Sequence, residues 1–374
     1  MNDLNLYVLQ LLLVAAGVSA LVWRTNIVCR LQVCGWVLLN YVIALRYGLI
    51  GQLEFYSNDQ LHFVNVVETL LAGTVSADVD WWISSARVPF TIPAFVLASA
   101  GIDVALALKT TSLLFLLGTT HLIVRHARIQ SLSGSALLSF MTGLAFSGSF
   151  FSSLAQRETS MMFFAVLLFV GKSPAVRGAS LLMLLLLRPH LAVAIAIGWI
   201  CAVLSQRDFR KRSWSPGRAV TAIASGAVIG YVLFGVGFQY QTGISGIFGH
   251  QFGIRPVLRI ASNFMGLQFL TAYDTTIELS VSQLLLGRLI FAETILIPVA
   301  FTLHVLTSRG TSQLTRWTLW SFAIYVGLVT NTDFNSFRQN IPLIPVMGLC
   351  VMEVLKHKTD SRRSTAEFRT LAET

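Results

Sequence analysis

The sequence predicts an all-α protein that crosses a lipid bilayer many times, and three observations support this prediction. Of the 374 residues, 55% are hydrophobic and only 12% are charged. That charged share is about half the share in an ordinary soluble domain. Apolar runs of about 15 to 20 residues recur between short polar breaks, and they lack the strict alternation of a membrane β-strand. Helices are therefore the expected way across the bilayer.

Eleven apolar runs define the expected membrane helices. They cover residues 5–23, 31–50, 105–124, 133–151, 159–171, 178–188, 191–204, 219–238, 288–307, 317–330 and 340–355. The fifth, sixth and seventh runs are shorter than the roughly 20 residues that a full crossing needs. We expect these three helices to be tilted around a cavity embedded in the membrane.

Two apolar segments decide the number of crossings. The first run, 4–23, has no basic region before it and no small-residue cleavage site after it, so it does not match a signal peptide and should stay as a helix. Residues 88–104 are also apolar enough to cross, but counting them would put Arg125 and Arg128 outside. This segment is therefore expected to be a partly buried or surface helix in the first large outer loop.

The basic residues predict which helix ends face the cytoplasm. With the amino terminus outside, 18 of the 27 Lys and Arg residues fall in cytoplasmic segments, against 5 of the 17 acidic residues. The 18 are Arg24, Arg30, Arg125, Arg128, Lys172, Arg177, Arg207, Arg210, Lys211, Arg212, Arg218, Arg309, Arg316, Lys356, Lys358, Arg362, Arg363 and Arg369. This bias follows the positive-inside rule. We expect one transmembrane domain (1–355), a mobile cytoplasmic tail (356–374), and two larger outer loops with short helices (51–104 and 239–287).

The sequence also disfavours several classes of function. Its basic residues lie in breaks between apolar runs without interleaved aromatics, which argues against a nucleic-acid partner despite the net charge of +10. Nucleotide-binding, metalloprotease and serine-hydrolase motifs are absent, as are paired CxxC motifs and internal repeats. The four cysteines lie within or at the ends of apolar runs, so we expect free, structural thiols.

An acidic residue just beyond the second expected helix is the first candidate for catalysis. Asp59 lies in the segment YSNDQLH (56–62), where a helix would place it on one face with His62 and Phe63. A carboxylate there can act as a general base or as a metal ligand. The alternative is that Asp59 or the preceding asparagine caps a helix, and capping and catalysis can coexist in two neighbours.

Charged residues at helix ends form a second group of candidates. Arg157 and Glu158 follow a small polar stretch, and they either line a binding site or form a structural ion pair. Arg188-Pro189-His190 interrupts a leucine-rich run, so the helix should break there and free backbone groups. We expect Arg188 to line a polar cavity, because ionisable residues at membrane depth are costly and are by default functional candidates.

Three further arginines lie in the outer segments. Arg255 and Arg259 are four residues apart in the second large loop, and Arg338 occupies the last outer turn. The planar guanidinium binds phosphate through two parallel hydrogen bonds and stays charged even when poorly solvated. Several arginines on one rim of the membrane therefore fit a diphosphate-lipid headgroup, although each one taken singly can also bind ordinary lipid phosphates.

The order of these features resembles that of GT-C-type glycosyltransferases and of Wzy-type or EpsG-like polysaccharide polymerases. The motifs that carry the resemblance span about residues 40 to 350: Leu45-Arg46-Tyr47, YSND at 56–59, Ser152-Ser153 with Arg157-Glu158, Arg188-Pro189-His190, and Arg338 before Pro342 and Pro345. Each motif is short, so the resemblance depends on the order of the motifs along the chain and on their expected position on the same side of the membrane. Two helices precede the first outer loop, where the common GT-C layout has one, which favours the polymerase-like relatives.

The resemblance implies a substrate and a place of action. The substrate would be a sugar or oligosaccharide on a polyprenyl phosphate or diphosphate, used on the outer face of a bacterial plasma membrane in cell-surface polysaccharide biosynthesis. A divalent metal is compatible with it, although the sequence has no dedicated motif, and other polysaccharide-assembly proteins are candidate partners. The alternatives are a lipid-linked oligosaccharide flippase or secondary transporter, and a non-catalytic assembly subunit; transporters tend to place charges near the midplane between repeats.

The expected site combines one catalytic residue with seven that bind substrate. Asp59 is the expected catalytic residue, because it matches the essential acidic residue that GT-C enzymes carry in their first outer loop. The substrate-binding residues are expected to be Arg157, Glu158, Arg188, His190, Arg255, Arg259 and Arg338.

The topology can be tested by cysteine labelling in a background without the four native cysteines. A cysteine introduced at Ser76 should react with an impermeant maleimide in intact cells, because this loop is expected outside. A cysteine at Ser213 should react only after the membrane is permeabilised. The reverse pattern would invert the topology and remove the basis for the outer site.

Overall fold

The structure is a computed structural model, and all the regular secondary structure in the part of the chain that it describes is helical. It describes residues 2–25, 27–47, 57–74, 81–82, 86–130, 148, 151–154, 156–209, 215–242, 296–307, 311–330 and 341–353. Within these ranges no residue lies in a strand. The predicted all-α class is confirmed for this part of the chain.

Apart from α3 and α4, which lie in the first predicted outer loop, the described helices fall where the apolar runs predict them. Their bounds are α1 (Asn2–Val22), α2 (Ile27–Tyr47), α3 (Ser57–Leu71), α4 (Val88–Ser99), α5 (Val104–Ile129), α7 (Glu158–Val170), α8 (Pro174–Leu187), α9 (Pro189–Phe209), α10 (Pro216–Thr242) and α13 (Gln313–Thr330). Two further apolar helices cover Leu296–Thr307 and Ile341–Glu353. The expected helix at 133–151 lies almost wholly outside the described residues, and so does most of the loop at 239–287.

Four of the described helices are long and apolar enough to cross a membrane. Their apolar stretches are Asn5–Val22, Ile27–Leu45, Val104–Ile129 and Pro216–Leu233. The other apolar helices, α4 among them, have apolar stretches of 10 to 17 residues. The chain is therefore consistent with a membrane protein, while the count of eleven crossings stays a prediction.

The chain packs as two compact units. The first unit contains Met1–Arg125 and Met141–Pro189, and the second contains His126–Phe140 and His190–Thr374. The first unit holds α1 to α4, α5 up to Arg125, α7 and α8. The second unit holds the end of α5 from His126, α9 from His190, α10, α13 and the two unlabelled helices. The assignment of residues 1–355 to one transmembrane domain, with a tail at 356–374, stays a prediction.

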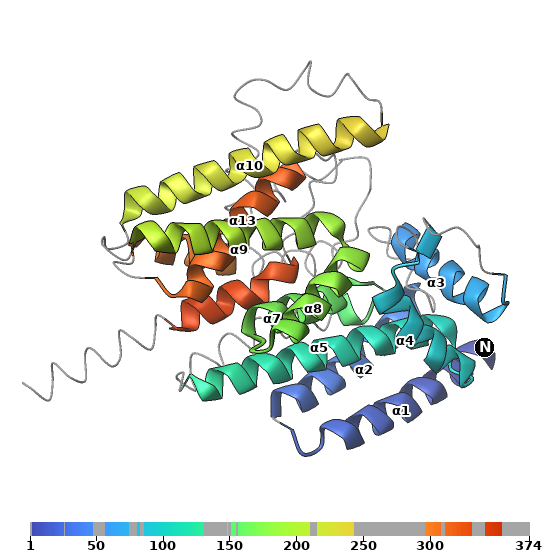
Figure 1. Cartoon of the computed structure of the whole chain (residues 1–374). Coiled ribbons are helices and arrows are strands. Elements are labelled where there is room, and N and C mark those ends of the chain that lie inside the picture. Colours follow the sequence, from blue (N-terminus) through green and yellow to red (C-terminus); the bar gives the residue numbers. More distant parts are fainter. Residues whose placement is uncertain are drawn as a thin grey trace, which may run out of the picture. The chain divides into compact units, whose positions relative to one another are not determined.

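In the first unit, α1 and α2 pack side by side and contribute to a core shared with α5 (Figure 1). Tyr7 and Leu11 of α1, Trp36 of α2, and Leu106 and Leu113 of α5 belong to this core. The outward faces of α1 and α2 remain apolar, and exposed leucines dominate them. Water would disfavour so much contiguous apolar surface, whereas lipid accommodates it.

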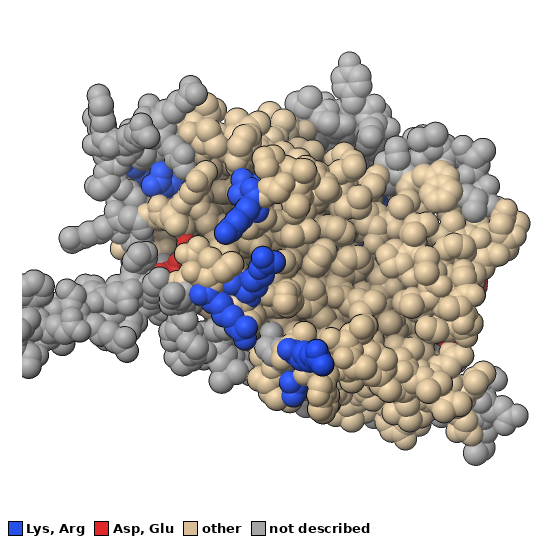
Figure 2. All heavy atoms as spheres, turned by 60° about the horizontal axis from the view of Figure 1, so that its bottom comes forward, with Lys and Arg blue, Asp and Glu red and all other residues tan. Residues whose placement is uncertain are grey.

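Charged side chains are few on the visible surface. Figure 2 shows a face that is mostly uncharged, with a few Lys and Arg side chains on it. In the first unit, exposed basic residues include Arg24 after α1, Arg125 near the end of α5, and Lys172 between α7 and α8. These are helix ends for which the sequence predicts a cytoplasmic position, and that position stays a prediction.

The second unit is organised by close contact between α10 and α13, which lie side by side (Figure 1). Gly226 of α10 faces Ala323 of α13, and a Cβ at Gly230 would overlap the carbonyl oxygen of Ile324. A Cβ at Gly327 would in turn overlap the carbonyl oxygen of Ala227. Small residues four apart on both helices therefore let the backbones touch, as in membrane helix pairs.

Candidate functional site

The predicted break between α8 and α9 organises the candidate site. Helix α8 ends at Leu187, and Arg188 has an extended backbone with φ −156° and ψ 90°. Its amide donates to the carbonyl of Leu184 at 2.7 Å, which closes the helix. Pro189 begins α9, because proline has no N–H to donate to the preceding turn and suits the first position of a helix.

Two arginines from distant parts of the first unit contact the carbonyls at the end of α8. Arg157 Nη1 donates to the carbonyl oxygen of Leu187 at 3.0 Å. Arg87 Nη1 donates to the carbonyl oxygen of Leu186 at 3.4 Å. The last carbonyls of a helix lack partners within it and carry partial negative charge, so cations stabilise them. The fold thus brings Arg157 to the peptide bond that joins Leu187 to Arg188.

Arg87 is held in an unusual backbone conformation. It precedes α4 in the left-handed region, with φ 50° and ψ 50°, and Pro89 follows in the first turn. For a residue other than glycine this conformation costs about 1–2 kcal/mol. The Thr91 hydroxyl donates to the carbonyl of Ala86 at 2.6 Å and helps to fix the turn. Such strain often occurs where a structure positions a particular side chain.

Helix α3 joins the same region through aromatic contacts. The Arg157 guanidinium lies 5.9 Å from the ring centroid of Phe63, within the range of a cation–π interaction. Phe63 packs edge to face on Phe90 of α4, with centroids 5.1 Å apart. Asp59 belongs to α3 one helical turn before Phe63, although its side chain lies outside the described part. The expected catalytic residue is therefore on a helix that contacts Arg157.

The segment that leads into α7 is buried and firmly anchored. The Ser112 hydroxyl of α5 donates to the carbonyl oxygen of Gln156 at 2.8 Å. The Trp36 indole N–H of α2 donates to the carbonyl oxygen of Ser152 at 2.9 Å. Glu158 begins α7 and is only 1% exposed. A carboxylate in the first turn of a helix is favoured by the helix dipole.

Lys109 is a buried charge that the sequence analysis did not select. It lies in α5 with 0% exposure, and its Nζ is 3.2 Å from the Tyr7 hydroxyl and 5.6 Å from the centroid of the Tyr7 ring. Asp103, at the start of the same helix, accepts a hydrogen bond from the Leu106 amide at 3.0 Å. The signal was present, because Lys109-Thr110-Thr111-Ser112 is a polar group inside an apolar run, and ionisable residues there are functional candidates.

The other predicted residues are not tested by the described structure. His190 lies in the first turn of α9, is exposed, and belongs to the second unit. Arg255, Arg259 and Arg338 lie outside the described residues. Among the residues that the structure does describe, no group of three His, Cys, Asp or Glu side chains could hold a metal ion.

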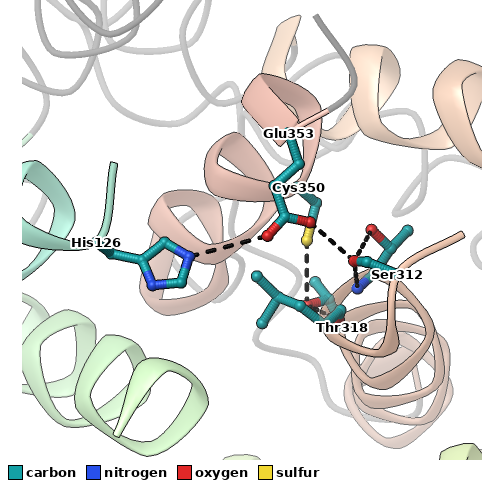
Figure 3. A network of polar contacts seen from close by, with 7 residues as sticks. His126, Ser312, Thr318, Cys350 and Glu353 are labelled. Carbon is teal, nitrogen blue, oxygen red and sulfur yellow. Dashed lines mark hydrogen bonds and ion pairs between the residues drawn. The ribbon is translucent and has the colours of Figure 1, made fainter. Parts of the chain in front are cut away.

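A separate polar network in the second unit has a structural explanation (Figure 3). Ser312 caps α13, because its Oγ accepts the Thr315 amide at 3.1 Å, and the same hydroxyl donates to Glu353 Oε2 at 2.8 Å. His126 Nε2 lies 3.8 Å from Glu353 Oε1. The Cys350 thiol donates to Thr318 Oγ1 at 3.5 Å, and none of the four cysteines, all of which the structure describes, forms a disulfide. The network fixes the ends of two helices and contains none of the predicted site residues.

Comparison with known proteins does not assign the chain to a family. No family model, curated protein or solved structure matches it. The class of protein is therefore defined by the helical, apolar fold, and its activity is inferred from the residues of the site.

The contact between Lys109 and Tyr7 predicts that these two residues are energetically coupled. Tyr7→Phe and Lys109→Met should each lower the unfolding temperature in detergent, because each removes one partner of a buried hydrogen bond. The double variant should lower the free energy of unfolding by less than the sum of the two single effects. The difference, which is the coupling energy between the two side chains, should be about 0.5–3 kcal/mol. Additive effects would show that the contact contributes nothing to stability.

Proposed function

We propose that this protein is a membrane glycosyltransferase or polysaccharide polymerase that uses a polyprenyl-linked sugar or oligosaccharide. The observation that carries the proposal is the convergence of Arg157 and Arg87 on the carbonyls of Leu187 and Leu186, next to Arg188. Three arginine residues thus lie at one helix break in a chain of which only 12% of the residues are charged. That concentration of positive charge fits a phosphate-bearing headgroup.

The arginines would bind the carrier and stabilise its departure. As the glycosyl group leaves, negative charge builds up on the phosphate or diphosphate of the carrier. Guanidinium groups placed beside that phosphate stabilise the developing charge, which is the usual source of transition-state stabilisation in phosphate chemistry. A guanidinium has several N–H donors, so a bond from Arg157 to a backbone carbonyl is compatible with phosphate binding through its other edge.

Asp59 would serve as the general base. The hydroxyl of the acceptor must lose its proton as the new glycosidic bond forms, and a positioned carboxylate can take it. The support for this role is the place of Asp59 on α3, whose Phe63 contacts Arg157 one helical turn further on. His62 lies beside Phe63 with its ring 5.4 Å away and is exposed.

The remaining parts of the proposal follow the resemblance described above. The reaction would occur on the outer face of a bacterial plasma membrane, with the amino terminus outside and the carboxyl terminus in the cytoplasm. It would contribute to cell-surface polysaccharide, together with other assembly proteins. A flippase would differ in its phenotype, because its loss leaves lipid-linked saccharide on the inner face instead of the outer face.

Arg188 and Arg157 should be required for carrier binding. Arg188→Lys and Arg157→Lys keep the charge but lose the planar fork, so binding of undecaprenyl diphosphate in nanodiscs should weaken about tenfold or more. Arg177→Lys is a matched control, because Arg177 Nε donates to the Gly171 carbonyl at 2.7 Å at another helix end. It should bind the carrier as the native protein does. Native affinity in both site variants, at unchanged protein level, would show that these arginines do not bind the carrier.

Asp59→Asn should abolish polymer or glycan formation while leaving the fold intact. The amide keeps the shape and most of the capping ability of the side chain but cannot accept the proton. We expect a rate loss of about 100- to 10,000-fold, with lipid-linked saccharide accumulating on the outer face. Native activity of Asp59→Asn, combined with inactive arginine variants, would favour a mechanism that depends on diphosphate binding without a carboxylate base.

A further inference from the structure

Beside the arginines, the first unit contains buried polar atoms without partners. Gln156 has 0% exposure, and neither its Nε2 nor its Oε1 has a hydrogen-bond partner among the residues that the structure describes. The hydroxyl of Thr159, three residues later in α7, is likewise buried and unpaired within the described ranges. Buried polar groups in proteins are nearly always paired with protein, water or ligand.

The backbone around Gln156 is nevertheless well fixed. Its carbonyl accepts the Ser112 hydroxyl at 2.8 Å, and its amide donates to the carbonyl of Leu154 at 2.7 Å. Both main-chain groups are thus satisfied while the side-chain amide is not. The backbone that carries the side chain is therefore held in place by α5 and by the turn before α7, which lowers the cost of ordering a binding site there.

The chemistry of these unpaired atoms points to a hydroxyl-rich ligand. A side-chain amide both donates and accepts, and a threonine hydroxyl does the same, so together they complement neighbouring hydroxyl groups that also donate and accept. Neither group carries charge, which distinguishes them from the arginines. Gln156 immediately precedes Arg157, whose guanidinium reaches the end of α8. A ligand with a phosphate and adjacent hydroxyls would satisfy both sets of groups.

We infer that Gln156 and Thr159 form a sugar-binding subsite for the saccharide next to the phosphate of the polyprenyl carrier. This inference rests on the proposed function, because the arginines supply the phosphate end of the same site. It adds that recognition of the sugar is separable from recognition of the carrier. The subsite discriminates a carrier that bears a saccharide from the bare carrier, because a hydrogen-bonding site rejects ligands that leave its groups unpaired.

The test compares two buried glutamines of the same unit. Gln156→Leu removes an amide that has no partner in the described chain, whereas Gln32→Leu removes one whose Oε1 accepts the Thr120 hydroxyl at 3.0 Å. Each variant is purified as the full chain from cells that make the polysaccharide. Mass spectrometry then gives the ratio of saccharide-bearing to bare polyprenyl diphosphate that copurifies with the protein, and thermal unfolding gives its stability.

Gln156→Leu should lower that ratio about tenfold or more and should keep or raise the unfolding temperature, because it removes no hydrogen bond within the described chain. Gln32→Leu should lower the unfolding temperature and leave the ratio unchanged. An unchanged ratio in Gln156→Leu would overturn the sugar subsite alone and would indicate that the amide binds water. A native protein that copurifies with neither lipid would overturn the proposed function together with this inference.

Discussion

The need to satisfy the backbone at the end of α8 shapes the rest of the site. Pro189 cannot donate a hydrogen bond to the preceding turn, so the last carbonyls of α8 need partners from elsewhere. In hydrocarbon, where water cannot serve, such groups are costly to leave unpaired. Arg157 and Arg87 supply the donors, and their charge suits the negative end of the helix dipole. A structural requirement therefore concentrates positive charge at one point of an apolar protein.

The contacts of these two arginines connect three helices of the first unit. Arg157 lies on Phe63 of α3, Phe63 packs on Phe90 of α4, and Arg87 at the start of α4 returns to α8. These contacts link α3, α4, α8 and the segment before α7, so that each of the four contacts two of the others. A substitution at any member should therefore affect the positions of the others, and we expect the arginines and Asp59 to act as one site.

The sequence predicted the helices better than it predicted the contacts between them. Apolar run length predicted α5 as residues 105–124, and the structure extends it to Ile129 because Arg125, His126 and Arg128 can continue a helix beyond an apolar core. The break at Arg188-Pro189 was predicted because proline acts locally.

The partners of Arg157 could not be predicted in this way, since the Leu187 carbonyl is 30 residues away in sequence. The left-handed backbone of Arg87 could not be predicted either, because glycine or asparagine usually marks such a conformation and this residue is an arginine. Lys109 was missed for a different reason. The apolar run around it was interpreted as an ordinary membrane helix, although a charged residue inside such a run is itself an indication of function.

The most direct test of the central claim is a cryo-electron microscopy structure of the protein with a bound polyprenyl-diphosphate saccharide. The account predicts phosphate oxygens within about 3 Å of guanidinium nitrogens of Arg157 or Arg188, at the end of α8. It also predicts that α3 lies on the sugar side of that phosphate. A diphosphate bound away from the end of α8, with Arg157 contacting only the Leu187 carbonyl, would contradict it.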